Sequence, residues 1–219
     1  MNKLKISALL KDAFNVLVKY PQLFIIGVVA MVPSLFMGTK VDLRLMFGVI
    51  FSMLVGIYCT GLIIRFIYTS KEGFSSWLET NKFVLKKYLA LLMLFVLMYL
   101  IMAVGLILLV IPGIIISVRL FLSDYGILLE GDRIIPSIKR SWGMTKGNWW
   151  RIAWLVLMAS LPSFILLPFS SFIPKPIYKF CFFILGSFGF VWSQAIFFHV
   201  YMALRKTDET LPQESKGYK

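Results

Sequence analysis

The side chains best suited to chemistry lie within an otherwise apolar stretch, residues 113–130. If this stretch is a straight helix, about 100° of rotation per residue places Arg119, Ser123 and Glu130 on nearly one face. Asp124 points about 140° away from Arg119. Ionisable groups at membrane depth cost roughly 3 kcal/mol or more on insertion scales, so they mark candidate sites. Two explanations stay open: a polar site for a ligand head group or an ion, and a buried pair that pins helices together while Arg119 snorkels.

Arg119 has no easy partner within this stretch. Asp124 faces the wrong way on a straight helix, and Glu130 lies about 16 Å further along the axis at about 1.5 Å per residue. We therefore expect Arg119 to find its partner on another helix, or to face a hydrated outer cavity that could hold an anionic head group.

The sequence shows no pattern for catalysis or metal binding. Its single histidine, His199, has no serine beside it in a recognisable motif, and nucleophilic catalysis needs a base next to the nucleophile. The two cysteines, Cys59 and Cys181, fall in different apolar segments, and one histidine without paired cysteines does not make a metal site. We expect no enzyme activity, no cofactor and no metal.

A stripe of small residues recurs at four-residue spacing within one apolar segment: Gly48, Ser52, Gly56 and Thr60. Small residues in this register let helix backbones approach closely. Helix packing within one chain is the preferred interpretation, and a dimer interface is the alternative.

The stretch 134–150 combines apolar anchors with cations. Its anchors are Ile134, Ile138, Trp142 and Trp149, and its candidate lipid head-group contacts are Lys139, Arg140 and Lys146. This pattern predicts an interfacial helix whose cations meet anionic lipid phosphates. Ordinary membrane anchoring is preferred to specific lipid recognition.

Composition predicts that these residues belong to an all-α, polytopic membrane bundle. Of the 219 residues, 59% are hydrophobic and 15% charged, with a mean hydropathy of +0.85. A soluble domain carries about 25% charged residues. Several apolar runs reach the roughly 20 residues that cross a hydrocarbon core about 30 Å thick. The prediction is one membrane domain, residues 1–205, with six transmembrane helices at about 22–37, 45–69, 88–111, 113–129, 150–172 and 177–204.

Three further features complete this layout. A break at Pro112 and Gly113 is expected to form the outer turn between the third and fourth spans. The tail, residues 206–219, is polar and expected to be cytoplasmic and disordered. Residues 4–19 predict an amphipathic interfacial helix with an apolar stripe of Ile6, Leu9, Leu10, Ala13, Phe14 and Leu17.

The distribution of cations predicts the orientation. Among 23 Lys and Arg residues, Arg119 falls within a span, and those expected in the outer loops are Lys40, Arg44, Lys175 and Lys179. Because cytoplasmic loops collect Lys and Arg, both termini are expected on the cytoplasmic side. The same bias explains the net charge of +13 without nucleic acid as a partner.

Residues 109–151 contain a combination of short motifs: Pro112-Gly113-Ile114-Ile115, Glu130, Arg140-Ser141, and Gly147-Asn148 before an aromatic pair. This combination resembles the YciC-type (UPF) inner-membrane proteins and the related membrane domain of some bacterial glycerophosphodiester phosphodiesterases. The resemblance implies a bacterial cytoplasmic-membrane protein of largely unassigned molecular function, and it brings no catalytic residues. Arg119 and Asp124 depart from the more apolar fourth span expected of the YciC-like branch.

Together these features predict a non-enzymatic protein of the cytoplasmic membrane with an envelope- or lipid-related role. Its expected partners are membrane lipids, with other membrane proteins or a second copy of the chain as alternatives. The alternative function is a small transporter or lipid carrier that uses the polar face of the fourth span. That alternative gains support if a water-filled cavity reaches Arg119 and Asp124, and loses it if they form a dry pair.

Overall fold

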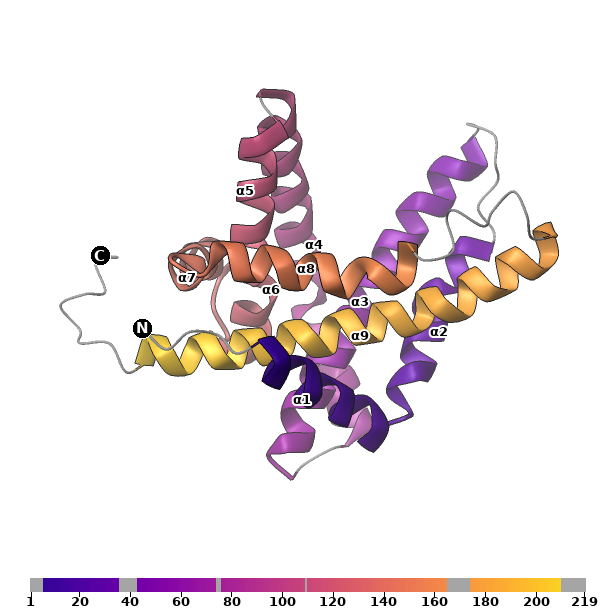
Figure 1. Cartoon of the computed structure of the whole chain (residues 1–219), viewed down its shortest axis with the longest axis horizontal. Helices are drawn as coiled ribbons and strands as arrows, with labels where there is room; N and C mark the ends of the chain where they lie inside the picture. Colours follow the sequence, from indigo (N-terminus) through magenta and orange to yellow (C-terminus); the bar gives the residue numbers. More distant parts are fainter. Residues whose placement is uncertain (1–5, 36–42, 74–75, 109, 165–173, 210–219) are drawn as a thin grey trace.

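The computed structural model describes residues 6–35, 43–73, 76–108, 110–164 and 174–209, and every regular element in them is helical (Figure 1). The elements are α1 (Ile6–Lys19), α2 (Leu23–Leu35), α3 (Leu43–Lys71), α4 (Trp77–Leu108), α5 (Val110–Leu120), α6 (Ser123–Tyr125), the π-helical turn η1 (Gly126–Glu130), α7 (Ile134–Thr145), α8 (Trp149–Phe164) and α9 (Lys175–Glu209). The predicted all-α class is confirmed.

Three of these helices are long and apolar enough to cross a membrane. The qualifying segments span 27 residues of α3, 29 of α4 and 30 of α9. At about 1.5 Å per residue, each is longer than a hydrocarbon core of roughly 30 Å. α1 and α2 meet at 93° and would add a fourth crossing if they form one bent span. The described residues therefore hold three or up to four candidate spans.

The six crossings predicted from the sequence are more than the described residues show. α2, α5 and α8 contain 13, 11 and 16 residues, each short for a full crossing. α2 and α8 adjoin residues 36–42 and 165–173, which lie outside the described part of the chain. The tail was expected to be disordered from residue 206, but α9 continues to Glu209. Residues 210–219 lie outside the described part of the chain.

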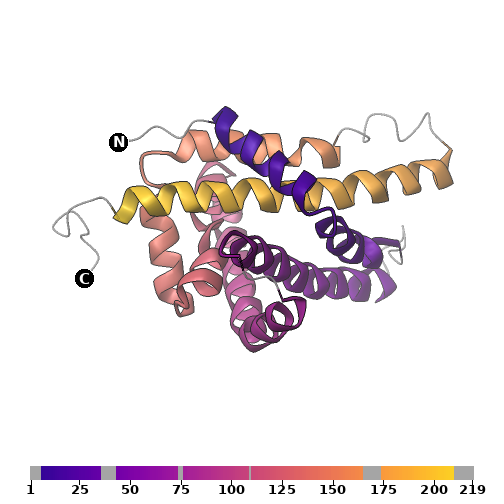
Figure 2. The same cartoon turned by 90° about the horizontal axis from the view of Figure 1, so that it is seen from below.

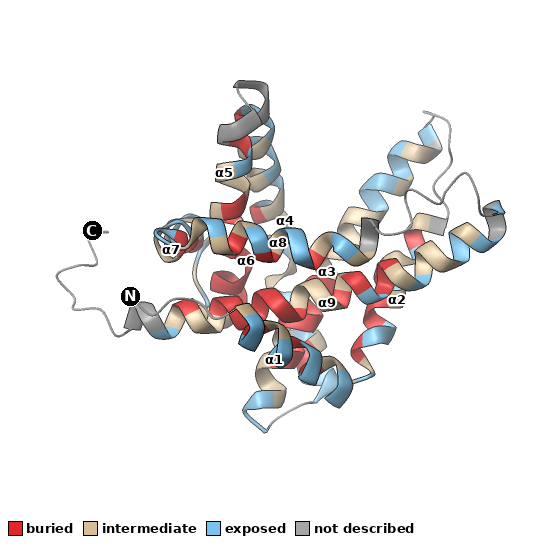
Figure 3. Ribbon diagram, viewed as in Figure 1, coloured by how far each residue is buried: buried red, intermediate tan, exposed pale blue. Residues whose placement is uncertain are grey.

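The outer surface of α4 supports a membrane environment. Only 17% of its most apolar window is buried within the protein. Much of the α4 ribbon has the colours of exposed or intermediate residues (Figure 3). One face presents a continuous row of exposed apolar side chains, Leu85, Leu89, Met93, Val96, Leu100 and Val104. A row of this length would be costly in water and is expected of a helix that faces lipid.

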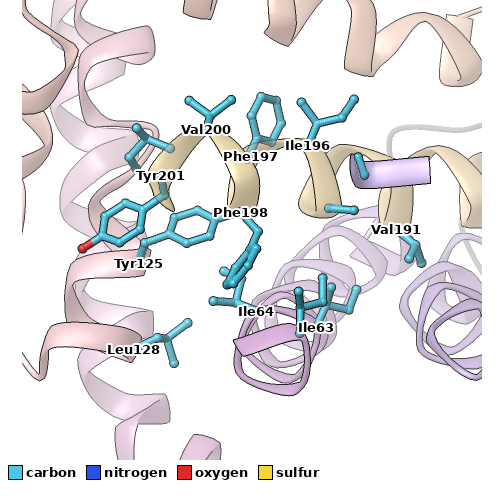
Figure 4. Close-up of a cluster of buried hydrophobic side chains, with 14 of the residues drawn as sticks. Ile63, Ile64, Tyr125, Leu128, Val191, Ile196, Phe197, Phe198, Val200 and Tyr201 are labelled. Atoms are coloured by element: carbon cyan, nitrogen blue, oxygen red, sulfur yellow. The ribbon is translucent and has the colours of Figure 1, made fainter. Parts of the chain in front are cut away.

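The buried core follows the middle of α9. This helix packs against α1, α2, α3 and α8. Its buried side chain Phe198 points toward Ile64 of α3, whereas Ile196 points to the opposite side of α9 (Figure 4). α9 thereby connects elements from both ends of the sequence.

α1 is the amphipathic helix predicted at 4–19, and it lies across α9 (Figure 2). Its buried residues are Leu9, Ala13 and Val16. Phe14, which was expected on the apolar stripe, is 54% exposed. One side of α1 therefore packs on protein, and Phe14 is left to face the surroundings.

The predicted break between the third and fourth spans is present, but its position was wrong. α4 ends at Leu108, and α5 runs continuously through Pro112 and Gly113. Proline is tolerated in the first turn of a helix, where its missing N–H would have no partner in any case. α5 packs on α4 so closely that a Cβ at Gly105 would lie 3.1 Å from Gly113 Cα. Gly113 therefore serves helix contact instead of a turn.

Candidate functional site

The segment predicted as a straight fourth span is broken. α5 ends at Leu120, and the chain turns at Phe121 and Leu122 before α6 begins. Gly131 ends the following π-helical turn with φ of +73°, a conformation that glycine adopts because it has no Cβ. The helical faces inferred from the sequence do not continue past Leu120. The four candidate residues accordingly have different surroundings.

Hydroxyl groups of α7 satisfy the backbone at this break. Ser141 Oγ donates to the Arg119 carbonyl oxygen over 2.6 Å and accepts from the Leu122 N–H over 3.3 Å. Ser137 Oγ donates to the Ser123 carbonyl oxygen. Backbone groups without partners are costly in apolar surroundings. α7 therefore stabilises the broken helix through its polar face.

The helix predicted within 134–150 is present as α7, but its buried residues differ from the predicted anchors. They are Ser137, Ser141 and Thr145, which are small and polar. Lys139 and Lys146 are exposed, so their contacts with lipid head groups stay a prediction. α7 is held by hydrogen bonds to α5 and α6 in addition to any contact with lipid.

Arg140, the third candidate head-group contact, already has a protein partner. Its Nε lies 2.6 Å from Asp132 Oδ2, and its Nη2 lies 3.3 Å from Oδ1. The hydrogen-bonded carboxylate raises the pKa of Arg140. This paired geometry ties the middle of α7 to the loop after η1.

Arg119 lies against α7. Its guanidinium carbon is 4.7 Å from the centroid of the Trp142 ring, a cation–π arrangement. Its Nε is buried and has no hydrogen-bond partner among the described residues. The partner expected on another helix is thus the aromatic ring of Trp142 and not a carboxylate, and a hydrated outer cavity at Arg119 stays a prediction. Because α5 ends one residue later, Arg119 lies at the level of α7 instead of deep within a longer helix.

Glu130 joins η1 to α9. Its Oε1 lies 3.0 Å from Arg205 Nε and accepts a hydrogen bond of 3.1 Å from the Tyr201 hydroxyl. Tyr201 also stacks on Tyr125, with ring centroids 5.2 Å apart (Figure 4). Glu130 is therefore part of an anchoring contact, separate from the surroundings of Arg119.

Asp124 borders a cavity of about 400 Å³ between α2, α3, α4 and α9. Small-molecule pockets commonly measure about 300–1,000 Å³. Most lining side chains are apolar, and those with polar groups are Ser52, Thr60, Tyr99, Asp124 and Gln194. Arg119 does not line it. The structure thus brings Asp124 to a cavity without its predicted companions Arg119, Ser123 and Glu130.

The small residues of α3 belong to this cavity. Three members of the predicted stripe border it, namely Ser52, Gly56 and Thr60. A Cβ added at Gly56 would have no heavy atom within 4 Å, so this glycine does not mark a close helix contact. Gly48 lies nearer the N-terminal end of α3, does not border the cavity, and is half-buried. A close contact occurs at Gly27 of α2, where a Cβ would lie 2.6 Å from the Ser187 carbonyl oxygen of α9.

His199 has a lysine neighbour. Its Nε2 lies 3.0 Å from Lys71 Nζ, and its Nδ1 lies 2.8 Å from the Ala195 carbonyl oxygen. Both ring nitrogens therefore have partners already. The described residues contain no cluster of three metal-ligating side chains.

Sequence reasoning missed several cavity residues. Phe95, Phe121 and Phe190 are ordinary members of apolar segments and give no signal. Gln194 did offer one, because an amide inside an apolar span is expensive and tends to face a cavity or another polar group.

Three long apolar helices and a mostly apolar cavity between them define a helical membrane protein. A family model described as Domain of unknown function (DUF7847) matches residues 34–205, so the chain belongs to this family. The match shows no link to the YciC-type proteins or to the phosphodiesterase membrane domain that residues 109–151 resemble. No curated protein and no solved structure matches the chain.

Proposed function

We propose that this protein is a non-enzymatic, multi-pass protein of the cytoplasmic membrane that binds an amphiphilic molecule of the bilayer in its cavity. The observation that carries the proposal is the cavity of about 400 Å³ bordered by α2, α3, α4 and α9. Its lining is apolar at most positions and carries a few polar groups, which suits a ligand with an apolar chain and a small head. Such molecules are concentrated in the lipid that surrounds these helices.

The proposed topology has six crossings and both termini on the cytoplasmic side. α3, α4 and α9 supply three of the crossings, and we assign the others to α2, to α5 with α6, and to α8. The scarcity of Lys and Arg in the expected outer loops supports this orientation. Termini on one side require an even number of crossings, which the shorter helices complete.

A small transporter or lipid carrier is the second candidate. It is favoured by Asp124, because a carboxylate beside an intramembrane cavity is a common feature of substrate and proton pathways. Binding and transport differ in whether the ligand leaves on the other side. Net movement of a fluorescent amphiphile between the leaflets of proteoliposomes, absent from empty liposomes, would favour transport.

Binding is tested with a photoactivatable long-chain alcohol and the purified protein in lipid nanodiscs. We expect cross-links to lining residues such as Met53 and Met98, located by peptide mass spectrometry. Gly56→Leu should abolish these cross-links, because its side chain would occupy open space in the cavity. The control Ala103→Leu adds apolar volume on the exposed face of α4 and should leave them unchanged. Labelling restricted to outward-facing residues in the wild type would contradict the proposal.

A further inference from the structure

Resting on the proposed function, we infer that the cavity selects amphiphiles whose head group is an organic ammonium. Asp124 is the only Asp, Glu, Lys or Arg among the described residues that line it. The chain carries a net charge of +13, yet no lysine or arginine of its described part belongs to this lining. The charge presented to a ligand is therefore that of a carboxylate.

Asp124 lacks an ionic partner within the described part of the protein. The two ion pairs found there join Arg140 to Asp132 and Arg205 to Glu130. Asp124 Oδ1 accepts a hydrogen bond of 3.0 Å from the Tyr125 N–H. A buried carboxylate is costly unless a cation or further donors compensate its charge. A ligand ammonium in the cavity would supply that compensation.

Aromatic rings line the same cavity. They belong to Phe95, Tyr99, Phe121 and Phe190. Cations are attracted to the faces of aromatic rings, and quaternary ammonium groups are bound in proteins by clusters of such rings. One carboxylate among several rings therefore matches an ammonium group with apolar substituents.

The same lining disfavours anionic head groups. A phosphate or carboxylate beside Asp124 would meet a like charge without a lysine or arginine to offset it. Arg119, the cation predicted to serve such a head group, lies against Trp142 instead. Anionic lipids are thus expected to be excluded from this cavity.

The flexible methionine side chains in the lining suit ligands of varied shape. Met31, Met53 and Met98 contribute unbranched thioether side chains that can adjust to an irregular apolar group. The specificity therefore rests on the head group, and one site can serve an aminolipid or a soluble hydrophobic cation.

The test compares a photoactivatable long-chain amine with the matched alcohol on the protein in nanodiscs of uncharged lipid. In the wild type we expect the amine to label the cavity at a concentration about tenfold lower than the alcohol. Asp124→Asn should bring the amine to the level of the alcohol without altering alcohol labelling. Asp12→Asn, which removes the same charge from the exposed face of α1, should change neither.

A second variant addresses the rings independently of the carboxylate. Phe121→Leu keeps apolar volume but removes one ring face, and amine labelling should weaken about threefold while alcohol labelling holds. Competition by a single-chain ethanolamine lipid or by a soluble tetraalkylammonium salt identifies which source of ammonium the cavity accepts.

The outcomes separate the two proposals. Equal labelling of the wild type by amine and alcohol would overturn the ammonium inference and leave amphiphile binding intact. Absence of cavity labelling by both probes would overturn the proposed function as well. An amine preference that survives Asp124→Asn would also overturn the inference, because the carboxylate would then not be its source.

Discussion

The Ser141 hydroxyl of α7 donates a hydrogen bond of 2.6 Å to the Arg119 carbonyl oxygen at the end of α5. Ser141 Oγ also accepts a hydrogen bond of 3.3 Å from the Leu122 N–H. One side chain thus serves both sides of the break between α5 and α6. This arrangement makes the broken helix dependent on α7.

Ser141→Ala should destabilise the protein, because it leaves the Leu122 N–H and the Arg119 carbonyl without this partner. The expected loss is about 1–3 kcal/mol of unfolding free energy. The control Ser160→Ala removes a hydroxyl bonded only to the Leu157 carbonyl oxygen of its own helix and should cost less than about 0.5 kcal/mol. Unfolding in detergent is followed by tryptophan fluorescence. Equal costs for the two variants would show that the break does not need α7.

Two glycines in helices should respond oppositely to the same substitution. Gly27→Ala places a Cβ 2.6 Å from the Ser187 carbonyl oxygen, so α2 and α9 must separate, at a cost of about 1–3 kcal/mol. Gly56→Ala meets no heavy atom within 4 Å and should be neutral or stabilising by up to about 1 kcal/mol through helix propensity. The two stability changes are compared through the thermal unfolding midpoints of both variants and the wild type in the same detergent. Destabilisation by Gly56→Ala would mean that α3 packs closely at this point.

Glu130→Gln should distinguish the contribution of the Glu130 charge to stability from the contribution of its hydrogen bond with Tyr201. The amide oxygen can still accept from the Tyr201 hydroxyl, but the ion pair with Arg205 is lost. Because both partners are partly exposed, we expect a cost of about 1 kcal/mol that shrinks as salt is added. Glu130→Ala should cost more, since it removes both contacts. A cost for Gln that is independent of salt would argue against an electrostatic contribution.

Arg119 and Trp142 should be coupled in a double-mutant cycle. Arg119→Leu removes the guanidinium that lies over the ring, and Trp142→Leu removes the ring. The coupling free energy should be about 0.5–2 kcal/mol, as for partly desolvated cation–π pairs. Unfolding of the two single variants and the double variant gives this quantity. Additive costs would place Arg119 in some other interaction.

The orientation is tested with single cysteines in a background of Cys59→Ala and Cys181→Ala. Ser76→Cys and Gly143→Cys lie in segments expected inside, and Pro174→Cys lies in a segment expected outside. An impermeant thiol reagent applied to intact cells should label only Pro174→Cys, and permeabilised cells should show labelling of all three. External labelling of Gly143→Cys would reverse the proposed topology.

The sequence by itself was sufficient for the class of helical membrane protein and for the existence of a break between the third and fourth predicted spans, but not for the position of that break. Residence in a membrane and helix formation depend on the length and polarity of each segment, and these can be judged without knowing any neighbour. The amphipathic α1 was likewise predictable, because its apolar spacing is local. The exposure of Phe14 was not, since it depends on how α1 lies on α9.

The candidate site was decided by tertiary structure. Sequence periodicity assumes a straight helix, and the break at Phe121 and Leu122 cancels that assumption for every later residue. The break is stabilised by Ser141, which is 19 residues away from Leu122, so the local sequence around Leu122 does not predict it. Asp124 reaches a cavity and Arg119 reaches Trp142 for the same reason. The direction of a buried polar side chain depends on which helices pack around it, and that packing involves the whole chain.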